Sequence, residues 1–195
     1  MRNLMIAVAV AVVLCAVGGA SAVTVTCDDL TLGSSYIVGD SFTTGGVVVS
    51  VQEFVLGGGG TSSGNVSVTN GGAAGGSGNE LMLNNVNLDI NFGTTIDGMA
   101  IMFGDMGGSL NLSVNGDQRV IQDFSEVQNA IIGGTQIFVV GTGSQGGLFV
   151  IGLINQFSIG GQELAVDNLV ANCIPEPATL GLLGLGGLAL LRRKR

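Results

Sequence analysis

Apolar and polar residues alternate along several stretches of the chain, which is the pattern of β-strands with one buried face. The clearest cases are residues 86–92 and 110–115, where Val, Leu, Ile and Phe alternate with Asn, Asp and Ser. Asn115-Gly116 ends the second stretch, and this dipeptide favours a tight turn between paired strands. Further strands are predicted at residues 47–56, 65–69, 95–103, 136–140, 148–159 and 163–170.

About ten strands at short spacing, joined by turns rich in Gly, Asn and Ser, indicate an all-β body. We expect a single antiparallel β-sandwich, jelly-roll-like in topology, with one short helical turn at residues 123–129 that Ser125 could cap. A parallel β-helix is the alternative because Gly and Asn are frequent, but no fixed repeat period supports it. Most of the eight phenylalanines should lie in the core.

Two glycine-rich segments interrupt the strand pattern, at residues 57–64 and 71–78, in a chain that contains 35 glycines. Their few apolar side chains cannot support regular buried elements, so we expect mobile hairpin loops on either side of the strand at 65–69. Neither segment contains the Gly-Lys-Ser/Thr sequence of a phosphate-binding loop. The glycines therefore indicate loops and not a nucleotide site.

The N-terminal residues 1–22 form a separate segment. They contain one early positive charge, an apolar stretch and the small residues Ala20-Ser21-Ala22. This three-part pattern predicts a helical secretory signal peptide that is cleaved after Ala22. The β-rich body then comprises residues 23–173, and residues 174–195 form a third segment.

The C-terminal segment begins with a proline-rich stretch, Pro175-Glu176-Pro177. An uncharged run rich in Gly and Leu follows at 178–191, and the chain ends in four basic residues. As a helix the run would be about 21 Å long, which is short for a membrane span, although the basic side chains can extend it. We predict a short transmembrane helix whose basic end stays in the cytoplasm.

The order of these three parts resembles the PEP-CTERM sorting signal of Gram-negative bacteria. The resemblance implies that an exosortase, a membrane protease-transpeptidase, recognises Pro175, Glu176 and Pro177 and removes or exchanges the tail. It also implies export, membrane anchoring before processing, and a final place at the cell surface or outside the cell. An ordinary membrane anchor with a proline-rich stalk is the alternative.

Proteins with such signals accompany extracellular polysaccharide and biofilm matrix, so the resemblance further implies a structural or adhesive matrix role. A carbohydrate-binding module, with or without calcium, is the alternative function. The absence of Trp and the single Tyr argue against it, because sugar sites usually offer aromatic platforms. Residues 161–170 also resemble the closing strand of secreted β-sandwich domains, and we expect Asp167 and Asn168 to form a turn or cap there.

Cys27 and Cys173 remain after the signal peptide, which contains Cys15, is removed. An even pair in an exported protein predicts a disulfide, with two free thiols as the alternative. Residues 23–174 contain 13 acids and one base, a net charge of 1 − 13 = −12. Such a charge repels the phosphate backbone of nucleic acid, so we exclude a nucleic-acid partner.

Catalytic residue types are scarce. The chain has no histidine, and no lysine lies in the body, so we expect no enzyme. Two carboxylate pairs, Asp97 with Asp105 and Asp123 with Glu126, keep a hydrolase as a third hypothesis. We expect no cofactor and assign no metal ligand, although a structural calcium could use the many carboxylate and carbonyl oxygens.

Overall fold

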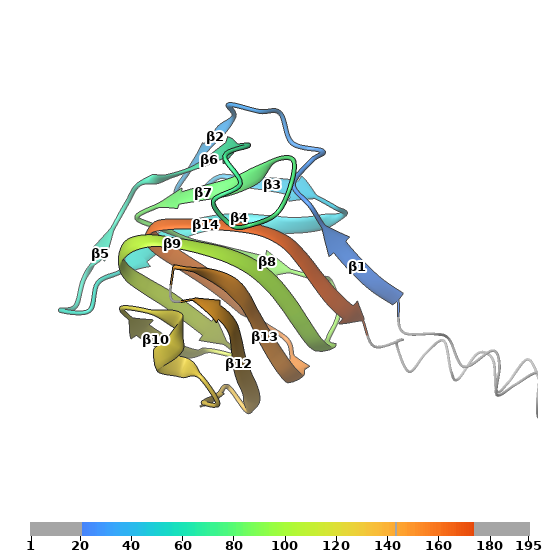
Figure 1. Ribbon diagram of the computed structural model, residues 1–195, viewed down its shortest axis with the longest axis vertical. Helices are drawn as coiled ribbons and strands as arrows, with labels where there is room; N and C mark the ends of the chain where they lie inside the picture. Colours follow the sequence, from blue (N-terminus) through green and yellow to red (C-terminus); the bar gives the residue numbers. More distant parts are fainter. Residues whose placement is uncertain (1–20, 143, 174–195) are drawn as a thin grey trace, which may run out of the picture.

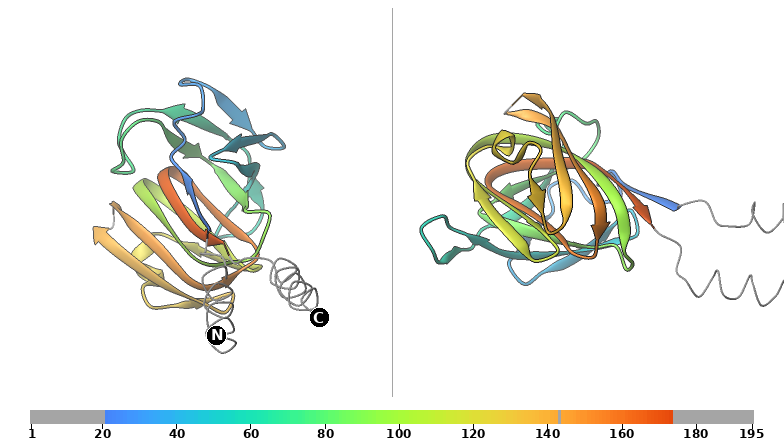
Figure 2. Two further views of the ribbon diagram at one scale, coloured as in Figure 1. Left: turned by 90° about the vertical axis from the view of Figure 1, so that its right-hand side faces the viewer. Right: turned by 90° about the horizontal axis from the view of Figure 1, so that it is seen from below.

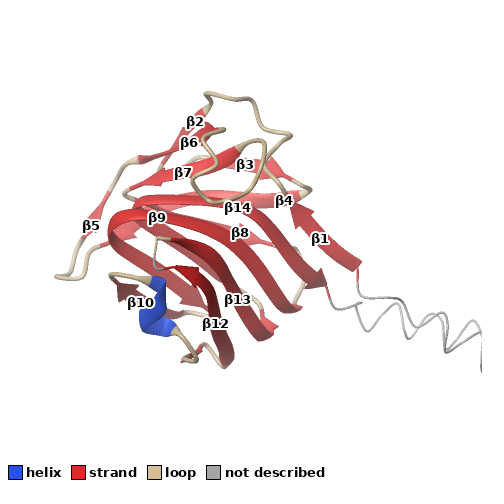
Figure 3. Cartoon of the chain, in the orientation of Figure 1, coloured by secondary structure: helices blue, strands red, loops and turns tan. Residues whose placement is uncertain are grey.

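The computed structural model describes residues 21–142 and 144–173 (Figure 1). The predicted signal helix and C-terminal helix lie outside these residues, and no helix among the described residues is long and apolar enough to cross a membrane. Almost all regular structure is β-strand (Figure 3). The strands are β1 (Ser21–Val25), β2 (Ser35–Ile37), β3 (Ser41–Thr44), β4 (Val47–Val55), β5 (Thr61–Ser62), β6 (Asn65–Thr69), β7 (Glu80–Asn84), β8 (Val86–Asn91), β9 (Ile96–Val114), β10 (Asp117–Ile121), β11 (Ile131–Ile132), β12 (Thr135–Thr142), β13 (Gln145–Ile154) and β14 (Phe157–Cys173).

These strands form one 14-stranded sheet whose central path is β11-β12-β13-β9-β14-β7-β6-β2. Every strand pair is antiparallel, which confirms the predicted all-β antiparallel body and excludes a parallel β-helix. The two longest strands, β9 and β14, run beside each other through the middle. Along its other edge β14 pairs in turn with β8, β7 and β1.

Strand β9 arches over and turns back, so that the sheet folds into two layers (Figure 2). Its first half pairs with β13 and its second half with β10. Between the halves, Gly107 and Gly108 have φ angles of 126° and 83°, which side chains strongly disfavour. The register with β14 also shifts next to Glu163, as expected where a strand bends at a bulge. The body is therefore one continuous antiparallel sheet that bends over on itself.

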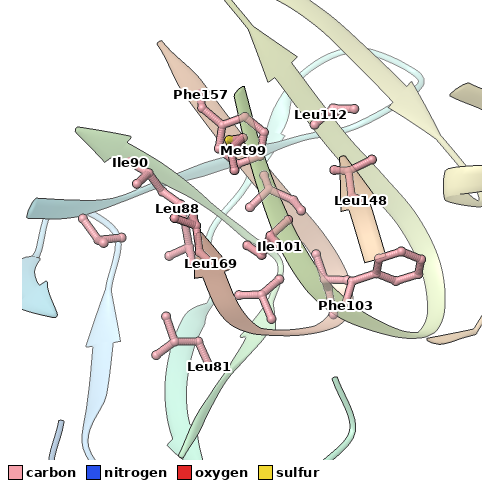
Figure 4. Close-up of a cluster of buried hydrophobic side chains, with 14 of the residues drawn as sticks. Leu81, Leu88, Ile90, Met99, Ile101, Phe103, Leu112, Leu148, Phe157 and Leu169 are labelled. Carbon is pink, nitrogen blue, oxygen red and sulfur yellow. The ribbon is translucent and has the colours of Figure 1, made fainter. Parts of the chain in front are cut away.

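The core lies between the two layers (Figure 4). Ile101 and Phe103 from the first half of β9 and Leu112 from the second half belong to the same buried cluster. Five phenylalanines are buried, which confirms most of the predicted core: Phe42, Phe54, Phe103, Phe124 and Phe157. Phe92 and Phe138 are partly buried, and Phe149 points outward from β13 and is 38% exposed.

Local signals gave mixed results. Asn115 and Gly116 have φ angles of 50° and 82° and join β9 to β10, as the sequence predicted. The helical turn is a 3-10 helix, Phe124–Val127, but its cap is Asp123 and not Ser125. The Asp123 carboxylate accepts a hydrogen bond from the Ser125 backbone N–H at 2.6 Å.

The two glycine-rich segments behave differently. Residues 57–60 are exposed and form the turn of the β4–β5 hairpin, as expected. Residues 71–78 do not project as a free loop but pack onto the outer face of the sheet. The Ala73 carbonyl accepts a hydrogen bond from the Gln145 side chain at 2.8 Å, and Ala74 is fully buried. The segment connects β6 to β7 as the predicted hairpin loop, and it packs on the sheet because glycines let its backbone approach closely.

Candidate functional site

The two ends of the described chain lie side by side. β1 pairs with the last part of β14, with Ser21 opposite Cys173 and Val25 opposite Leu169 (Figure 1). Cleavage after Ala22 would remove two residues of β1 and leave the rest paired. The predicted signal peptide and the C-terminal segment therefore attach to the same end of the body.

The same register separates the two cysteines. Cys173 lies opposite Ser21, whereas Cys27 follows the far end of β1. At about 3.3 Å per residue, the six residues from Ser21 to Cys27 span on the order of 15–20 Å, far beyond the ~7 Å limit between the Cα atoms of a disulfide. Both thiols are free in the structure. The predicted Cys27–Cys173 disulfide is thus wrong, because strand pairing places the cysteines at opposite ends of β1.

The thiols should differ in reactivity. Burial raises the pKa of Cys27 to about 12, and the nearby charges of Asp167 and Asp29 add to this effect. Because the thiolate is the reactive form, Cys27 should resist alkylation in the folded protein, while the partly exposed Cys173 should react.

We therefore expect native alkylation to modify Cys173 only, and alkylation after unfolding to modify both residues. Intact mass spectrometry with and without reductant checks this, and Cys173→Ser is the control that should abolish native labelling. A mass gain of two hydrogens on reduction would contradict the assignment.

Three carboxylates gather beneath the loop of residues 71–78. Glu80 is buried and accepts hydrogen bonds from the backbone N–H groups of Ala73 at 3.1 Å and Ala74 at 2.9 Å. Asp28 accepts from the Asn79 backbone N–H at 2.8 Å. Asp167 lies on β14 and is 3% exposed. Glu80 and Asp28 hold the glycine-rich loop against the sheet. Within the part of the chain described, no group of three metal-ligating side chains could hold a metal ion.

Asp167 lies at a bulge of β14 and not in the expected turn or cap. Asn168 has a φ of 48°, and the register with β9 shifts between Asp167 and Val170. The Asp167 carboxylate accepts hydrogen bonds from the Asn168 backbone N–H at 2.7 Å and from its side-chain amide at 3.1 Å. Burial raises the pKa of Asp167 to about 6; the Asn168 N–H opposes this, and the charges of Asp28 and Glu80 add to it.

This raised pKa predicts a pH dependence of stability. The ordinary value is 3.8, so the folded protein binds the Asp167 proton more tightly than the unfolded chain does. The resulting stabilisation is complete below about pH 4 and is lost as the pH rises to about 6. Urea denaturation across this range should show that Asp167→Asn lacks this loss, whereas Asp89→Asn, which alters an exposed carboxylate, retains it. Equal pH profiles for both variants would contradict the role of Asp167.

The structure separates one of the two acid pairs suggested by the sequence and places the other at a single helical turn. Asp97 and Asp105 lie eight residues apart on β9, about 26 Å at strand spacing. Asp123 and Glu126 cap the 3-10 helix, with Glu126 accepting from the Gln122 backbone N–H at 2.9 Å. Burial raises the pKa of Asp105, the Gly107 N–H opposes this, and the charge of Asp123 adds to it. The neighbour of Asp105 is thus Asp123, a pairing that the sequence did not indicate.

A row of polar side chains crosses the outer face of the second layer. Strand register aligns one residue from each of six adjacent strands: Ser41, Ser50, Asp89, Ser158, Ser113 and Gln118. All are exposed or partly exposed, and their sequence neighbours on these strands include the buried Val49, Leu88 and Leu112. We call this set the polar row. Its hydroxyl, amide and carboxylate groups can form hydrogen bonds with a hydroxyl-rich ligand.

The next row contains two buried amides that frame a glycine. Asn87 on β8 and Asn111 on β9 both lie opposite Gly160 on β14. A Cβ at Gly160 would overlap the Asn87 side-chain oxygen, so the glycine lets the two amides meet in a hydrogen bond of 3.1 Å. Asn87 also donates to the Glu53 carbonyl at 2.8 Å. This network links β4, β8 and β9 through side chains beside the polar row.

A comparison with protein-family models identifies residues 174–195 as a PEP-CTERM protein-sorting motif. The chain is therefore an exported protein that carries a PEP-CTERM sorting segment, which confirms the resemblance drawn from its sequence. The motif implies membrane anchoring before processing by an exosortase, a membrane enzyme. Pro175, Glu176 and Pro177 lie outside the described residues, and their individual roles stay predictions. Neither the curated proteins nor the solved structures contain a match to this chain.

Sequence reasoning missed the carboxylate cluster and the polar row. Alternation did predict that Asp89 and Ser113 point away from the core, but it did not show which strands are neighbours. The cluster had one available signal, since Glu80 begins the strand that follows the glycine-rich segment at 71–78. That signal is weak without the fold.

Proposed function

We propose that this chain is a surface or extracellular-matrix protein of a Gram-negative bacterium, with a non-enzymatic body that has a structural or adhesive role. The sorting motif at residues 174–195 carries the proposal, because it directs the body out of the cell and anchors it before processing. We describe the body as a jelly-roll-like sandwich, which the folding of one sheet over a shared core supports.

The environment of the carboxylates supports a structural body. Glu80 and Asp28 bind loop backbone, and Asp123 and Glu126 cap a helical turn. The net charge of −12 for residues 23–174 suits a soluble domain outside the cell. Each of these acids thus has a role in folding.

The processing step can be tested on the protein from its native host. We expect the intact mass to correspond to loss of residues 1–22 and of the tail beyond 175–177. Glu176→Gln should leave the tail attached and the protein in the membrane fraction, whereas Glu163→Gln, outside the motif, should be processed normally. A tail retained in the unaltered protein would overturn the processing claim.

The matrix role needs its own test. Cells should be separated into membrane, surface and matrix fractions, and the processed protein should be found with the surface or matrix. Deleting the gene should weaken biofilm cohesion without changing growth on any single carbon source. Recovery of the processed protein only as a free culture-medium species would contradict the role.

The polar row favours one second function, binding of extracellular polysaccharide. Its hydroxyl, amide and carboxylate groups lie at strand spacing, about 4.8 Å, over six strands, a length that suits an extended saccharide chain. Within the row, Ser113 and Ser158 lie opposite each other on β9 and β14.

Cosedimentation with host polysaccharide tests this function. Replacing both Ser113 and Ser158 with valine should reduce binding several-fold. The same change at Ser35 and Ser67, which pair on β2 and β6, is the matched control and should not reduce it. Loss of binding in a chelator would assign calcium a part in it, and equal binding by all variants would exclude the polar row.

A further inference from the structure

Strands β11, β12 and β13, together with Val170 of β14, expose apolar side chains on the outer face of the first layer. Six residues define this apolar face, with exposed fractions from 38% to 62%: Ile131, Val140, Phe149, Ile151, Leu153 and Val170. The strand register places several of these residues close together. Phe149 and Val170 both lie opposite Ala100. Ile131 and Ile151 both lie opposite Gln136. An exposed apolar patch of this kind marks an interaction surface.

The charge pattern sets this face apart from the rest of the body. Residues 127–162 contain no Asp, Glu, Lys or Arg, although residues 23–174 hold 13 acids. The uncharged stretch includes β11, β12 and β13 completely. The partner of this face is therefore apolar, and charge attraction does not select it.

The position of the chain end identifies that partner. Cys173, the last residue of β14, lies opposite Ile96 of β9, which in turn lies opposite Ile154 of β13. Leu153 of the apolar face is thus about two strand spacings, ~10 Å, from the point where the chain continues toward the sorting segment. Only residues 174–177 separate Cys173 from the uncharged run at 178–191. Four residues span at most ~14 Å, so an anchored precursor holds the end of β14, and Leu153 beside it, close to the bilayer.

We propose that the apolar face rests on the lipid bilayer while the sorting segment anchors the precursor. Its Phe, Ile, Leu and Val side chains enter the headgroup region, where apolar side chains gain by leaving water. This contact orients the body before processing and brings the end of β14 to the membrane enzyme. The inference rests on the anchoring step and is independent of the matrix role.

The absence of tryptophan provides a test, because one introduced tryptophan reports on one position. Precursor that retains residues 174–195 is reconstituted in phosphatidylcholine vesicles with bromine-labelled lipid, which quenches fluorescence on contact. The fluorescence of Phe149→Trp should be quenched and blue-shifted. That of Ile37→Trp, at a position 60% exposed on β2 at the opposite end of the sheet path, should be neither. Protease protection of the tail measures anchoring separately.

A second pair of variants tests the face itself. In the Phe149→Trp background, replacing Ile151 and Leu153 with serine should abolish most of the quenching. Replacing the comparably exposed Leu32 and Ile37 with serine should leave it unchanged. Unquenched fluorescence of Phe149→Trp in a precursor with a protected tail would overturn the proposal. The proposal would also be overturned if cross-linking yielded a dimer in which the introduced indole is shielded from lipid. That result would assign the apolar face to a second copy of the chain.

Discussion

Replacing Phe103 with alanine should lower the free energy of unfolding by about 3–5 kcal/mol. Phe103 is fully buried just before the bend of β9, with its ring centroid 4.5 Å from that of Phe124 (Figure 4). Removing the ring leaves a cavity between the layers, and the hydrogen-bonded strands on both sides limit how far the site can collapse. The lost contact with Phe124 adds to the cost.

Urea denaturation followed by far-ultraviolet circular dichroism measures this effect, since the chain has no Trp and one Tyr. Phe149→Ala is the matched control, because it removes the same atoms from a side chain that points outward. It should cost less than about 1 kcal/mol. Similar losses for both variants would show that Phe103 does not occupy a packed core.

Replacing Gly104 with alanine should cost about 1–3 kcal/mol, because it introduces a methyl group where two backbones meet. A Cβ at Gly104 would overlap the carbonyl group of Ala73 in the glycine-rich loop. The added Cβ and the Ala73 carbonyl are both held directly by backbone, so no side-chain rotation relieves the overlap. The loop must shift, which strains the hydrogen bonds from Ala73 and Ala74 to the buried Glu80 carboxylate.

Hydrogen exchange distinguishes this local effect from general destabilisation. The amides of Ala73 and Ala74 should exchange faster in Gly104→Ala, while amides in the β9–β10 hairpin should change little. Gly58→Ala is the control, because no atom lies within 4 Å of a Cβ added there and the residue is exposed. Unchanged stability and exchange in Gly104→Ala would show that the loop does not pack on β9.

Residue alternation predicted most strands but not how they connect. Residues 95–103 and 110–115 were predicted as separate strands because Gly104, Gly107 and Gly108 interrupt the pattern. In the structure one strand, β9, runs from Ile96 to Val114 and includes these glycines. In a flat sheet these glycines would end a strand, whereas here they let it bend. Residues 148–159 were predicted as one strand, but β13 ends at Ile154 and β14 begins at Phe157.

The cysteines show the limit of arguments from spacing. One near each end of the body suggested a bridge, and the chain ends do lie together, since Ser21 is opposite Cys173. Cys27 is nevertheless remote, because β1 runs antiparallel to β14 and carries it away. The cellular compartment and the number of cysteines do not reveal in which direction a strand runs, so they do not show whether two cysteines meet.

The sequence by itself determined that this protein carries a sorting signal and that its body is all-β. A sorting signal is read as a linear segment, and period-two alternation is a local property of a strand, so neither needs the tertiary structure. Only the tertiary structure decided which outward residues share a face. The polar row and the apolar face each combine residues from several strands, and neighbouring strands in a sheet need not be neighbours in sequence. Long-range pairing, which places β9 against β14, therefore fixed both surfaces.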